Sequence, residues 1–338
     1  MAVVWSWAFG AETHTELDFM GWGGVSNQTV PVTGAGKVYT YSSFPGTKYS
    51  LELRKGFMVT APPLLPATGS VATAFKVQST YDNNNTVLDI VGNVDGDRCE
   101  IVVTNSSTGT VAGRVNGTVA GTATLPAGDW HYVSFTYDMS TTTYSAEFFA
   151  NGVSFGSATN SNFTNAQTGV AVRIEGVGQF IPNASLHAQL LAYDNATSAA
   201  DAATPMFVTR LDPNLDTSAV GSWTPSSGGT NVGVTGTNPY DNSTYTEESS
   251  PSSADNVVTQ VSNLATQLGI TPSTVLGATA HTYSSGSSIQ AFASIRDSGG
   301  AYTDGATVTP NVGDTTYAFA TSTGITGTST INLKYEIV

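Results

Sequence analysis

The sequence predicts an all-β protein built from two β-sandwich domains of the jelly-roll type. Apolar and polar residues alternate in short segments along the whole chain, which is the pattern of strands with one buried face and one wetter face. Asn-Gly and Asp-Gly pairs separate several of these segments, and 35 glycines in 338 residues suit many tight turns. Many short strands joined by such turns favour packed antiparallel sheets over layers of helix and sheet.

Four segments show the alternation most clearly, and each is a predicted strand. In residues 49–54, 170–175, 289–296 and 331–338, the first residue and every second residue after it are apolar or aromatic. Side chains two residues apart lie on the same face of a strand, so each of these segments offers one face to a core.

Four pairs of Asn or Asp followed by Gly are predicted turns, because Asn and Asp tolerate a positive φ and glycine adopts it freely. They are Asp95-Gly96, Asn116-Gly117, Asn151-Gly152 and Asp304-Gly305. Each pair therefore marks a place where the chain reverses between two strands.

The chain has one cysteine, which excludes a disulfide within the chain. Cys99 alternates with Ile101 and Val103, so we expect it on the apolar face of a strand. A buried structural thiol is the expected role of Cys99.

One segment fits a helix as well as a strand. Val257, Val261, Leu264 and Leu268 recur at helical spacing. Residues 255–258 also fit the start of a strand. The sequence leaves both structures open here.

The chain is long enough for two domains, since domains usually have about 100–200 residues. We place the boundary near Asp212-Pro213, which gives a first sandwich of residues 1–212 and a second of residues 213–338. The stretch 217–253, just after the boundary, is rich in Gly, Ser and Thr. It fits a flexible linker, but its spaced aromatic residues favour strands and loops of the second domain.

Charge and composition exclude several partners. Charged residues make up 11% of the chain and its net charge is −14. Nucleic-acid binding needs a cationic surface, so no nucleic-acid partner is expected. No apolar run approaches the roughly 20 residues of a membrane-spanning helix, so no membrane insertion is expected. Residues 1–10 contain no Lys or Arg, and we expect no secretory signal there.

Residues 129–138 and 144–153 resemble the central hairpin of laminin-G-like, concanavalin A-like jelly rolls. The first segment opens a strand at Trp130, and the second ends in the turn Asn151-Gly152. Residues 49–54 and 169–175 are placed like the flanking strands of that family. The resemblance covers residues 1–212 and implies a lectin-like fold for the first domain.

The C-terminal part resembles modules of bacteriophage tail and capsid-surface proteins, through residues 245–247, 272–283, 289–297, 304–308 and 333–338. The opening Trp5-Ser6-Trp7-Ala8-Phe9-Gly10 is also similar to the start of phage virion proteins. These resemblances imply a virion structural protein, either a capsid decoration or a tail-associated protein, that contacts other virion proteins. They also imply a homo-oligomer, with a trimer as one candidate. The alternative is a receptor-binding tail protein whose lectin-like domain binds host glycans.

No catalytic pattern is complete, so we expect no enzyme. Lectin-fold glucanases place three carboxylates on one strand, and Glu16-Leu17-Asp18 begins that pattern, but Met20 and Gly21 follow where the third carboxylate belongs. The four histidines, which are scattered, are His14, His131, His187 and His281. His131 and His187 lie within strand patterns and are expected to be half-buried or on the surface.

Two kinds of binding site have candidate residues. A glycan platform needs exposed aromatic rings with polar neighbours, and the candidates are Tyr39, Tyr41, Trp22 and Tyr193, although core packing explains most aromatic residues of a sandwich. Some laminin-G relatives hold Ca²⁺ with loop oxygens, and the candidate ligands here are Asp82, Asp95 and Asp97. Ordinary turns explain these aspartates as well, and no cofactor is expected.

Overall fold

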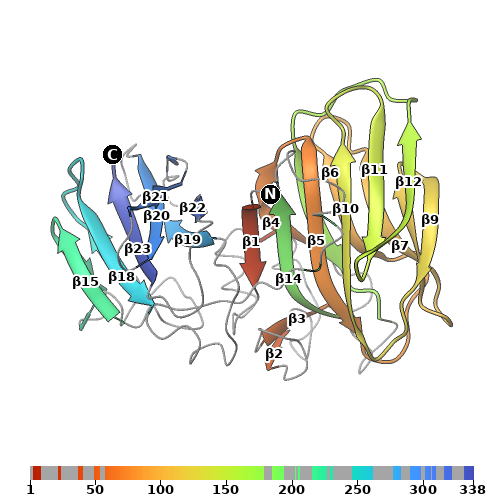
Figure 1. Cartoon of the computed structure of the whole chain (residues 1–338), viewed down its shortest axis with the longest axis horizontal. Helices are drawn as coiled ribbons and strands as arrows, with labels where there is room; N and C mark the ends of the chain where they lie inside the picture. The colour runs from red at the N-terminus through yellow and green to blue at the C-terminus, as the bar shows by residue number, and fades with distance from the viewer. Residues whose placement is uncertain are drawn as a thin grey trace. The chain divides into compact units, whose positions relative to one another are not determined.

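The computed structural model of the chain consists of β-strands joined by turns and loops (Figure 1). It describes residues 3–8, 22–23, 37–40, 49–53, 58–178, 185–193, 202, 205, 215–226, 229–230, 246–261, 277–282, 290–297, 301–305, 307–309, 316–321 and 331–338. Within these ranges all 23 named elements are strands, which confirms the all-β prediction. No helix in the described ranges has the length and apolar character needed to cross a membrane.

The chain divides into two compact units. Unit 1 comprises Met1–Asp18 and Trp22–Val208, and unit 2 comprises Phe19–Gly21 and Thr209–Val338. The boundary predicted at Asp212-Pro213 lies shortly beyond the division between Val208 and Thr209.

Unit 1 contains an eight-stranded sheet, called sheet A (Figure 1). Its strands run in the order β12 (Val153–Asn160), β11 (Tyr144–Ala150), β10 (Trp130–Asp138), β5 (Thr68–Val77), β14 (Ser185–Tyr193), β3 (Tyr49–Leu53) and β2 (Lys37–Thr40). The eighth strand, β1 (Val3–Ala8), pairs with the Gln189–Tyr193 half of β14, while β3 pairs with the Ser185–His187 half. All of these pairs are antiparallel.

A second, six-stranded sheet of unit 1 is called sheet B. Its order is β4 (Met58–Leu65), β13 (Val170–Glu175), β6 (Thr86–Gly92), β7 (Arg98–Asn105), β8 (Thr110–Val115) and β9 (Thr118–Thr124). Each strand is antiparallel to its neighbours. Cys99 of β7 is fully buried, as predicted, and burial raises the pKa of its thiol.

The two sheets pack face to face through large side chains of sheet A. Phe135 and Phe148 lie opposite each other on β10 and β11, with ring centroids 5.3 Å apart. A Cβ atom added to Gly113 of β8 would lie 2.4 Å from the Phe148 ring, so this ring packs directly on the backbone of sheet B. At one edge of the sandwich a Cβ on Gly121 of β9 would lie 1.8 Å from the carbonyl oxygen of Phe155 of β12. Glycine is needed there because two backbones approach each other.

The predicted turns form where hairpins need them. Asn116 and Gly117 have φ values of 43° and 85°, and Asn151 and Gly152 have 49° and 87°. Two positive φ values in succession define the type I′ turn that suits the twist of a hairpin. Asp304-Gly305 differs, because Asp304 belongs to strand β21 (Thr303–Asp304) and pairs with Ser294.

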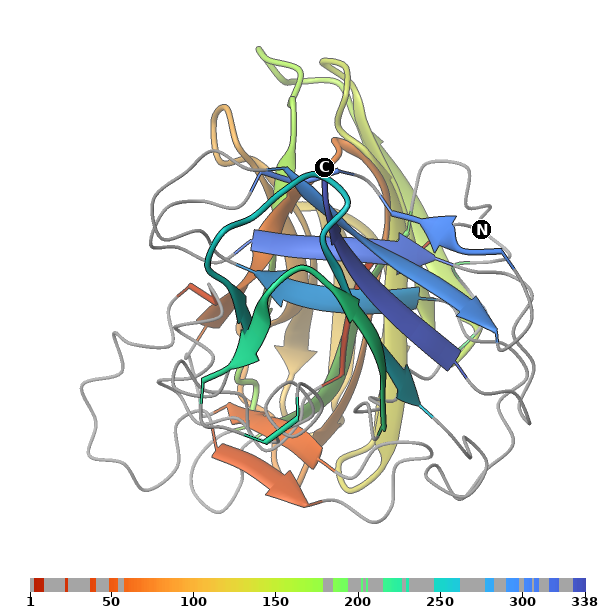
Figure 2. The ribbon, with the colours of Figure 1, turned by 90° about the vertical axis from the view of Figure 1, so that its left-hand side faces the viewer.

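Unit 2 has a five-stranded antiparallel sheet, whose strands lie beside one another in Figure 2. Its order is β15 (Leu215–Val220), β18 (Asn256–Val261), β23 (Ile331–Ile337), β20 (Ala291–Asp297) and β21. Two smaller pairs join β16 (Trp223–Pro225) to β17 (Thr246–Glu248) and β19 (Gly277–Thr282) to β22 (Thr316–Thr321).

Two segments of unit 2 settle alternatives that the sequence left open. Residues 256–261 form strand β18, so the strand interpretation is correct for them, while residues 262–268 lie outside the described residues. Parts of the stretch 217–253 form strands, including Trp223–Pro225, which favours structure over a linker in its described parts.

The buried face predicted for β20 is confirmed, while in β23 Ile331 and Ile337 of the predicted apolar face are buried but Tyr335 is partly exposed. Ala291, Ala293 and Ile295 are buried on one face, while Phe292 and Arg296 on the other face are partly exposed. This sheet therefore has an apolar face and a mainly polar face.

Candidate functional site

Two residues of the predicted glycan platform lie in the core, which makes that prediction wrong for them. Trp22 is 1% exposed and packs against Trp7, with ring centroids 5.6 Å apart. Tyr193 is also 1% exposed, and its hydroxyl lies 3.3 Å from the hydroxyl of Tyr132. A ring without an exposed face offers nothing for a sugar to stack on. The side chain of Tyr39 and all of Tyr41 lie outside the described residues.

The three predicted Ca²⁺ ligands do not meet. Asp82 precedes strand β6 and Asp95 and Asp97 follow it, so Asp82 is separated from the other two by about 20 Å of extended chain. Over the described ranges, no group of three or more His, Cys, Asp or Glu side chains is placed to hold a metal ion. Only Asp95 and Asp97 come together.

Asp95 and Asp97 belong to a cluster of polar loops that we call the polar loop end. It consists of the β6–β7 turn (residues 93–97), the turn at Asn116 and the segment 161–168. Asp95 accepts hydrogen bonds from Nε2 of Gln167 at 2.7 Å and from Nδ2 of Asn165 at 3.3 Å. Asp97 accepts one from Nδ2 of Asn116 at 2.9 Å. Three segments that are distant in the sequence thus hold two carboxylates in place.

The two carboxylates of the polar loop end influence each other. Burial and then the neighbouring Asp95 carboxylate raise the pKa of Asp97, while the hydrogen bond from Asn116 lowers it. The hydrogen-bond partners of this pair are neutral amides. The cluster therefore carries negative charge and suits ligands that donate hydrogen bonds.

Gln167 connects the segments of the polar loop end through its side-chain hydrogen bonds. It is buried, donates from Nε2 to Asp95 and to the hydroxyl of Tyr144, and accepts through Oε1 from the Val94 amide at 2.9 Å. A Cβ atom on Gly92 would lie 2.3 Å from the Gln167 side chain, so only glycine leaves room for it. This buried amide contacts the β6–β7 turn through one donor and its acceptor and contacts β11 through Tyr144, so it fixes the turn against that strand.

Phe163 places an aromatic ring beside these polar groups. Its ring stacks on that of Tyr144 with centroids 3.7 Å apart and an interplanar angle of 14°. Tyr144 is fully buried and donates its hydroxyl to the carbonyl oxygen of Asn165 at 2.8 Å, while Phe163 is partly exposed. A supported ring therefore lies two residues from an amide that contacts Asp95.

Sequence reasoning missed Phe163, Asn165 and Gln167. The available signal was a single aromatic residue in the otherwise polar segment 160–168 between two strands. An isolated ring in a polar loop is a place to look for binding.

A serine and a histidine also lie together, but in the core. Oγ of Ser185 is 3.4 Å from Nε2 of His187, and both residues are 0% exposed. Burial lowers the pKa of His187 to about 3. No substrate reaches a fully buried pair, so these residues pack the sandwich. His187 and His131 are both buried, which corrects the expectation of half-buried or surface positions.

Three carboxylates gather on the outer face of sheet B, and arginines form ion pairs with two of them, Asp89 and Glu100. Arg173, Asp89, Glu100 and Arg114 lie opposite one another in a row across four neighbouring strands. Asp89 is 0% exposed and accepts hydrogen bonds from Nε and an Nη atom of Arg173. Glu175 lies beside this row and accepts a hydrogen bond from the Thr86 amide at 2.6 Å. This is a paired charge network and not an open acidic groove.

The other predicted acids and histidines are not described. Glu16, Asp18 and His14 lie outside the described residues, and the side chain of His281 in β19 does too.

Among the comparisons with known proteins, the comparison with solved structures is the one that found similar proteins. No family model matches the chain. No curated protein matches it. A carbohydrate esterase from the Shiga toxin-encoding bacteriophage phi24B is 14% identical, with 58% of this chain and 99% of that chain covered and a TM-score of 0.37. The Ruminococcus gnavus sialidase CBM40 domain bound to α2,3-sialyllactose is 16% identical, with 46% and 94% covered and a TM-score of 0.32. The binding domain of Paraclostridial Mosquitocidal Protein 1 is 11% identical, with 51% and 45% covered and a TM-score of 0.35.

Proposed function

We propose that this chain is a non-catalytic carbohydrate-binding protein and that unit 1 binds a sugar at the polar loop end. The observation that carries the proposal is the partly exposed ring of Phe163, which is stacked on buried Tyr144 next to the fixed Asp95 carboxylate. An aromatic ring packs against the apolar face of a sugar, and planar polar groups beside it accept hydrogen bonds from the hydroxyls.

The arrangement of the polar loop end supports binding because it is formed before any ligand arrives. Gln167 connects Asp95, the Val94 amide and the Tyr144 hydroxyl, and Asn93 accepts a hydrogen bond from the Gly169 amide at 3.0 Å. Side chains that are already ordered lose little conformational entropy on binding.

The charge of the polar loop end favours a neutral sugar. Asp95 and Asp97 are acceptors when ionised, and the amides that contact them are uncharged. A saccharide that carries a carboxylate or phosphate would meet repulsion there, whereas hydroxyl groups would donate hydrogen bonds.

The non-catalytic part of the proposal has two supports. The Ser185–His187 pair is closed to solvent, and Asp89 and Glu100 of sheet B are buried and paired with arginines. General acids and nucleophiles need access to substrate, which neither group has.

The surface of a bacteriophage particle is the setting that we propose. It is supported by the resemblance of the C-terminal part to phage surface modules and by a Ser/Thr/Asn-rich exterior with 11% charged residues. In that setting the chain acts as a capsid decoration or tail-associated protein, in contact with other virion proteins, and the sugar site serves host attachment. An antibody against the chain should label purified particles; labelling of host cells alone would exclude this setting.

The binding proposal is tested by a glycan array of the full chain followed by calorimetric titration of the best neutral oligosaccharide. Phe163→Ala should weaken binding about tenfold, which corresponds to a loss of roughly 1.4 kcal/mol. Phe155→Ala removes another partly exposed phenylalanine of the same unit and should bind like the wild type. Absence of any saccharide binding, or equal affinity of Phe163→Ala and wild type, would overturn the proposal.

A further inference from the structure

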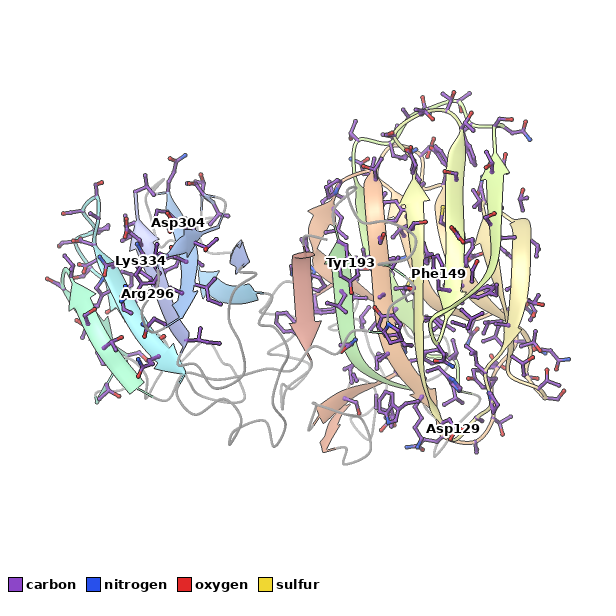
Figure 3. The ribbon with its side chains drawn as sticks, viewed as in Figure 1. Asp129, Phe149, Tyr193, Arg296, Asp304 and Lys334 are labelled. Atoms are coloured by element: carbon purple, nitrogen blue, oxygen red, sulfur yellow. The ribbon has the colours of Figure 1, made fainter. Side chains whose placement is uncertain are left out.

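The polar face of the sheet in unit 2 carries two cations that lie over aromatic rings. Cζ of Arg296 is 4.2 Å from the centroid of the Tyr302 ring. Nζ of Lys334 is 4.7 Å from the same centroid and 5.4 Å from that of Phe292. We call Phe292, Arg296, Tyr302 and Lys334 the cation–aromatic patch. Figure 3 labels Arg296 and Lys334 on this sheet.

Strand pairing places the cation–aromatic patch on one face. Lys334 of β23 lies opposite Ser294 of β20, and Arg296 lies two residues further along β20, so both side chains share the face opposite the apolar core of unit 2. All four residues of the patch are partly exposed. A ligand therefore has access to charged and aromatic groups together.

The two cations differ in their partners. Nζ of Lys334 is 2.7 Å from a carboxylate oxygen of Glu336. Arg296 forms no ion pair in the described part of the chain, and its buried Nε has no hydrogen-bond partner there. The chain has 25 acidic residues against 11 basic ones, so counter-charges for Arg296 are abundant in the sequence. A guanidinium that lies over a ring and lacks a carboxylate partner can bind the carboxylate of a ligand.

Amide side chains continue the same face beside Arg296. Asn332 lies opposite both Arg296 and Gln260, and Nε2 of Gln260 donates to Oδ1 of Asn332 at 3.0 Å. Asn332 is buried and Gln260 is partly exposed, so Gln260 is the amide of this pair that a sugar hydroxyl can reach.

We propose that the cation–aromatic patch is a second binding site, which takes a carboxylate-bearing saccharide. The Arg296 guanidinium would bind the carboxylate through two parallel hydrogen bonds, while Lys334 stays paired with Glu336 beside it. The rings of Phe292 and Tyr302 would pack against the sugar. This goes beyond the proposed function, because unit 1 offers carboxylates to a neutral sugar while unit 2 offers cations to an acidic one.

The test is titration of the full chain with trigalacturonate, with galactotriose as the neutral analogue and a short oligoglutamate as the acidic peptide. Trigalacturonate should bind, galactotriose should not compete for this site, and oligoglutamate should bind at least tenfold more weakly. Arg296→Gln should lower affinity for trigalacturonate at least tenfold. Arg296→Lys keeps the positive charge but loses the planar guanidinium that forms two parallel hydrogen bonds. This variant should retain part of the affinity.

Two controls make the result specific. Arg98→Gln removes an arginine of unit 1 whose side chain is 48% exposed, and it should bind trigalacturonate like the wild type. Phe163→Ala should also leave this binding intact, so failure of one site is distinguishable from failure of the other. Three outcomes would overturn the proposal: no binding of trigalacturonate, equal binding of oligoglutamate, or equal losses in Arg98→Gln and Arg296→Gln. Unchanged thermal unfolding of each variant shows that the fold is retained.

Discussion

The two units use their sheets in different ways. In unit 1 every residue of β14 is buried, and β5 is buried on both faces along most of its length. In unit 2, one face of β20 and β23 carries Phe292, Arg296 and Lys334, which are partly exposed, although Ser294 and Asn332 on the same face are buried. A sheet covered on both faces has no free side chains for a ligand. The middle of sheet A in unit 1 is therefore closed to ligands, and its candidate site lies on loops, whereas unit 2 leaves charged and aromatic side chains on a sheet face.

One contact shows how the outer face of sheet A is covered. Oγ of Ser134 on β10 donates to the carbonyl oxygen of Ala202 at 2.6 Å, and both residues are buried. Ala202, which follows the last strand of unit 1 in the sequence, thus covers the outer face of β10 at Ser134. Alternation alone would predict that this face is exposed to solvent.

The ion pairs of the two units provide the first and largest test. Arg173 joins Asp89, which is completely buried, whereas Lys334 and Glu336 both keep some exposure. Arg173→Ala leaves a buried carboxylate without its counter-charge and should lower the unfolding free energy of unit 1 by roughly 3–5 kcal/mol. Lys334→Ala should lower that of unit 2 by less than about 1 kcal/mol. Urea unfolding followed by tryptophan fluorescence measures both.

A double variant controls for lost packing at Arg173. Arg173→Met with Asp89→Leu removes both charges and should recover most of the stability lost in Arg173→Ala. Equal losses for Arg173→Ala and Lys334→Ala would contradict the difference in burial between the two units.

The second test is the pH dependence of unit 1. The pKa of His187 is about 3 in the folded chain and about 6.5 in the unfolded chain. Between these pH values the unfolded state binds a proton that the folded state does not, so the contribution present above pH 6.5 is lost as the pH falls. Stability should decrease by about 1.4 kcal/mol per pH unit, or about 2 kcal/mol from pH 6.5 to 5. Thermal unfolding at a series of pH values measures the slope.

His187→Gln provides the control for that slope, because glutamine does not titrate. The variant should lose this part of the pH dependence. If the unfolding free energy of the variant fell with pH as steeply as that of the wild type, His187 would be protonated in the folded chain. That result would contradict the burial of His187.

The smallest effects separate backbone strain from close packing in unit 1. Gly117 has a φ of 85° with open space around its Cβ position, so Gly117→Ala should lower stability by about 1 kcal/mol through strain alone. A Cβ on Gly121 meets the carbonyl of Phe155, so Gly121→Ala should lower stability by about 1–3 kcal/mol. Chemical denaturation compares the two variants. An unchanged unfolding free energy in Gly121→Ala would mean that the backbones of β9 and β12 do not approach each other at this edge of the sandwich.

Local patterns predicted the clearest strands and two hairpin turns because they need only neighbouring residues, although Asp304 belongs to a strand. The period of two gave the buried face of β20, and Asn116-Gly117 and Asn151-Gly152 gave two hairpin turns. The burial of Cys99 followed from the same alternation.

The sites depend on contacts between distant segments, which no local pattern contains. Gln167 reaches Asp95 across 72 positions of the sequence. Trp22 and Tyr193 were candidates because they are aromatic, but the packing of the sandwich decides that they are buried. Asp95 and Asp97 were found as an oxygen-rich turn, while their amide partners became visible only in the folded chain.

A crystal structure of the full chain with the best neutral saccharide from the array tests the central proposal most directly. We expect the sugar ring over Phe163, with its hydroxyls donating to Asp95 or Asp97. Density for the sugar on the outer face of sheet A, or over the Arg173–Asp89 row of sheet B, would contradict the proposal that unit 1 binds through its loops.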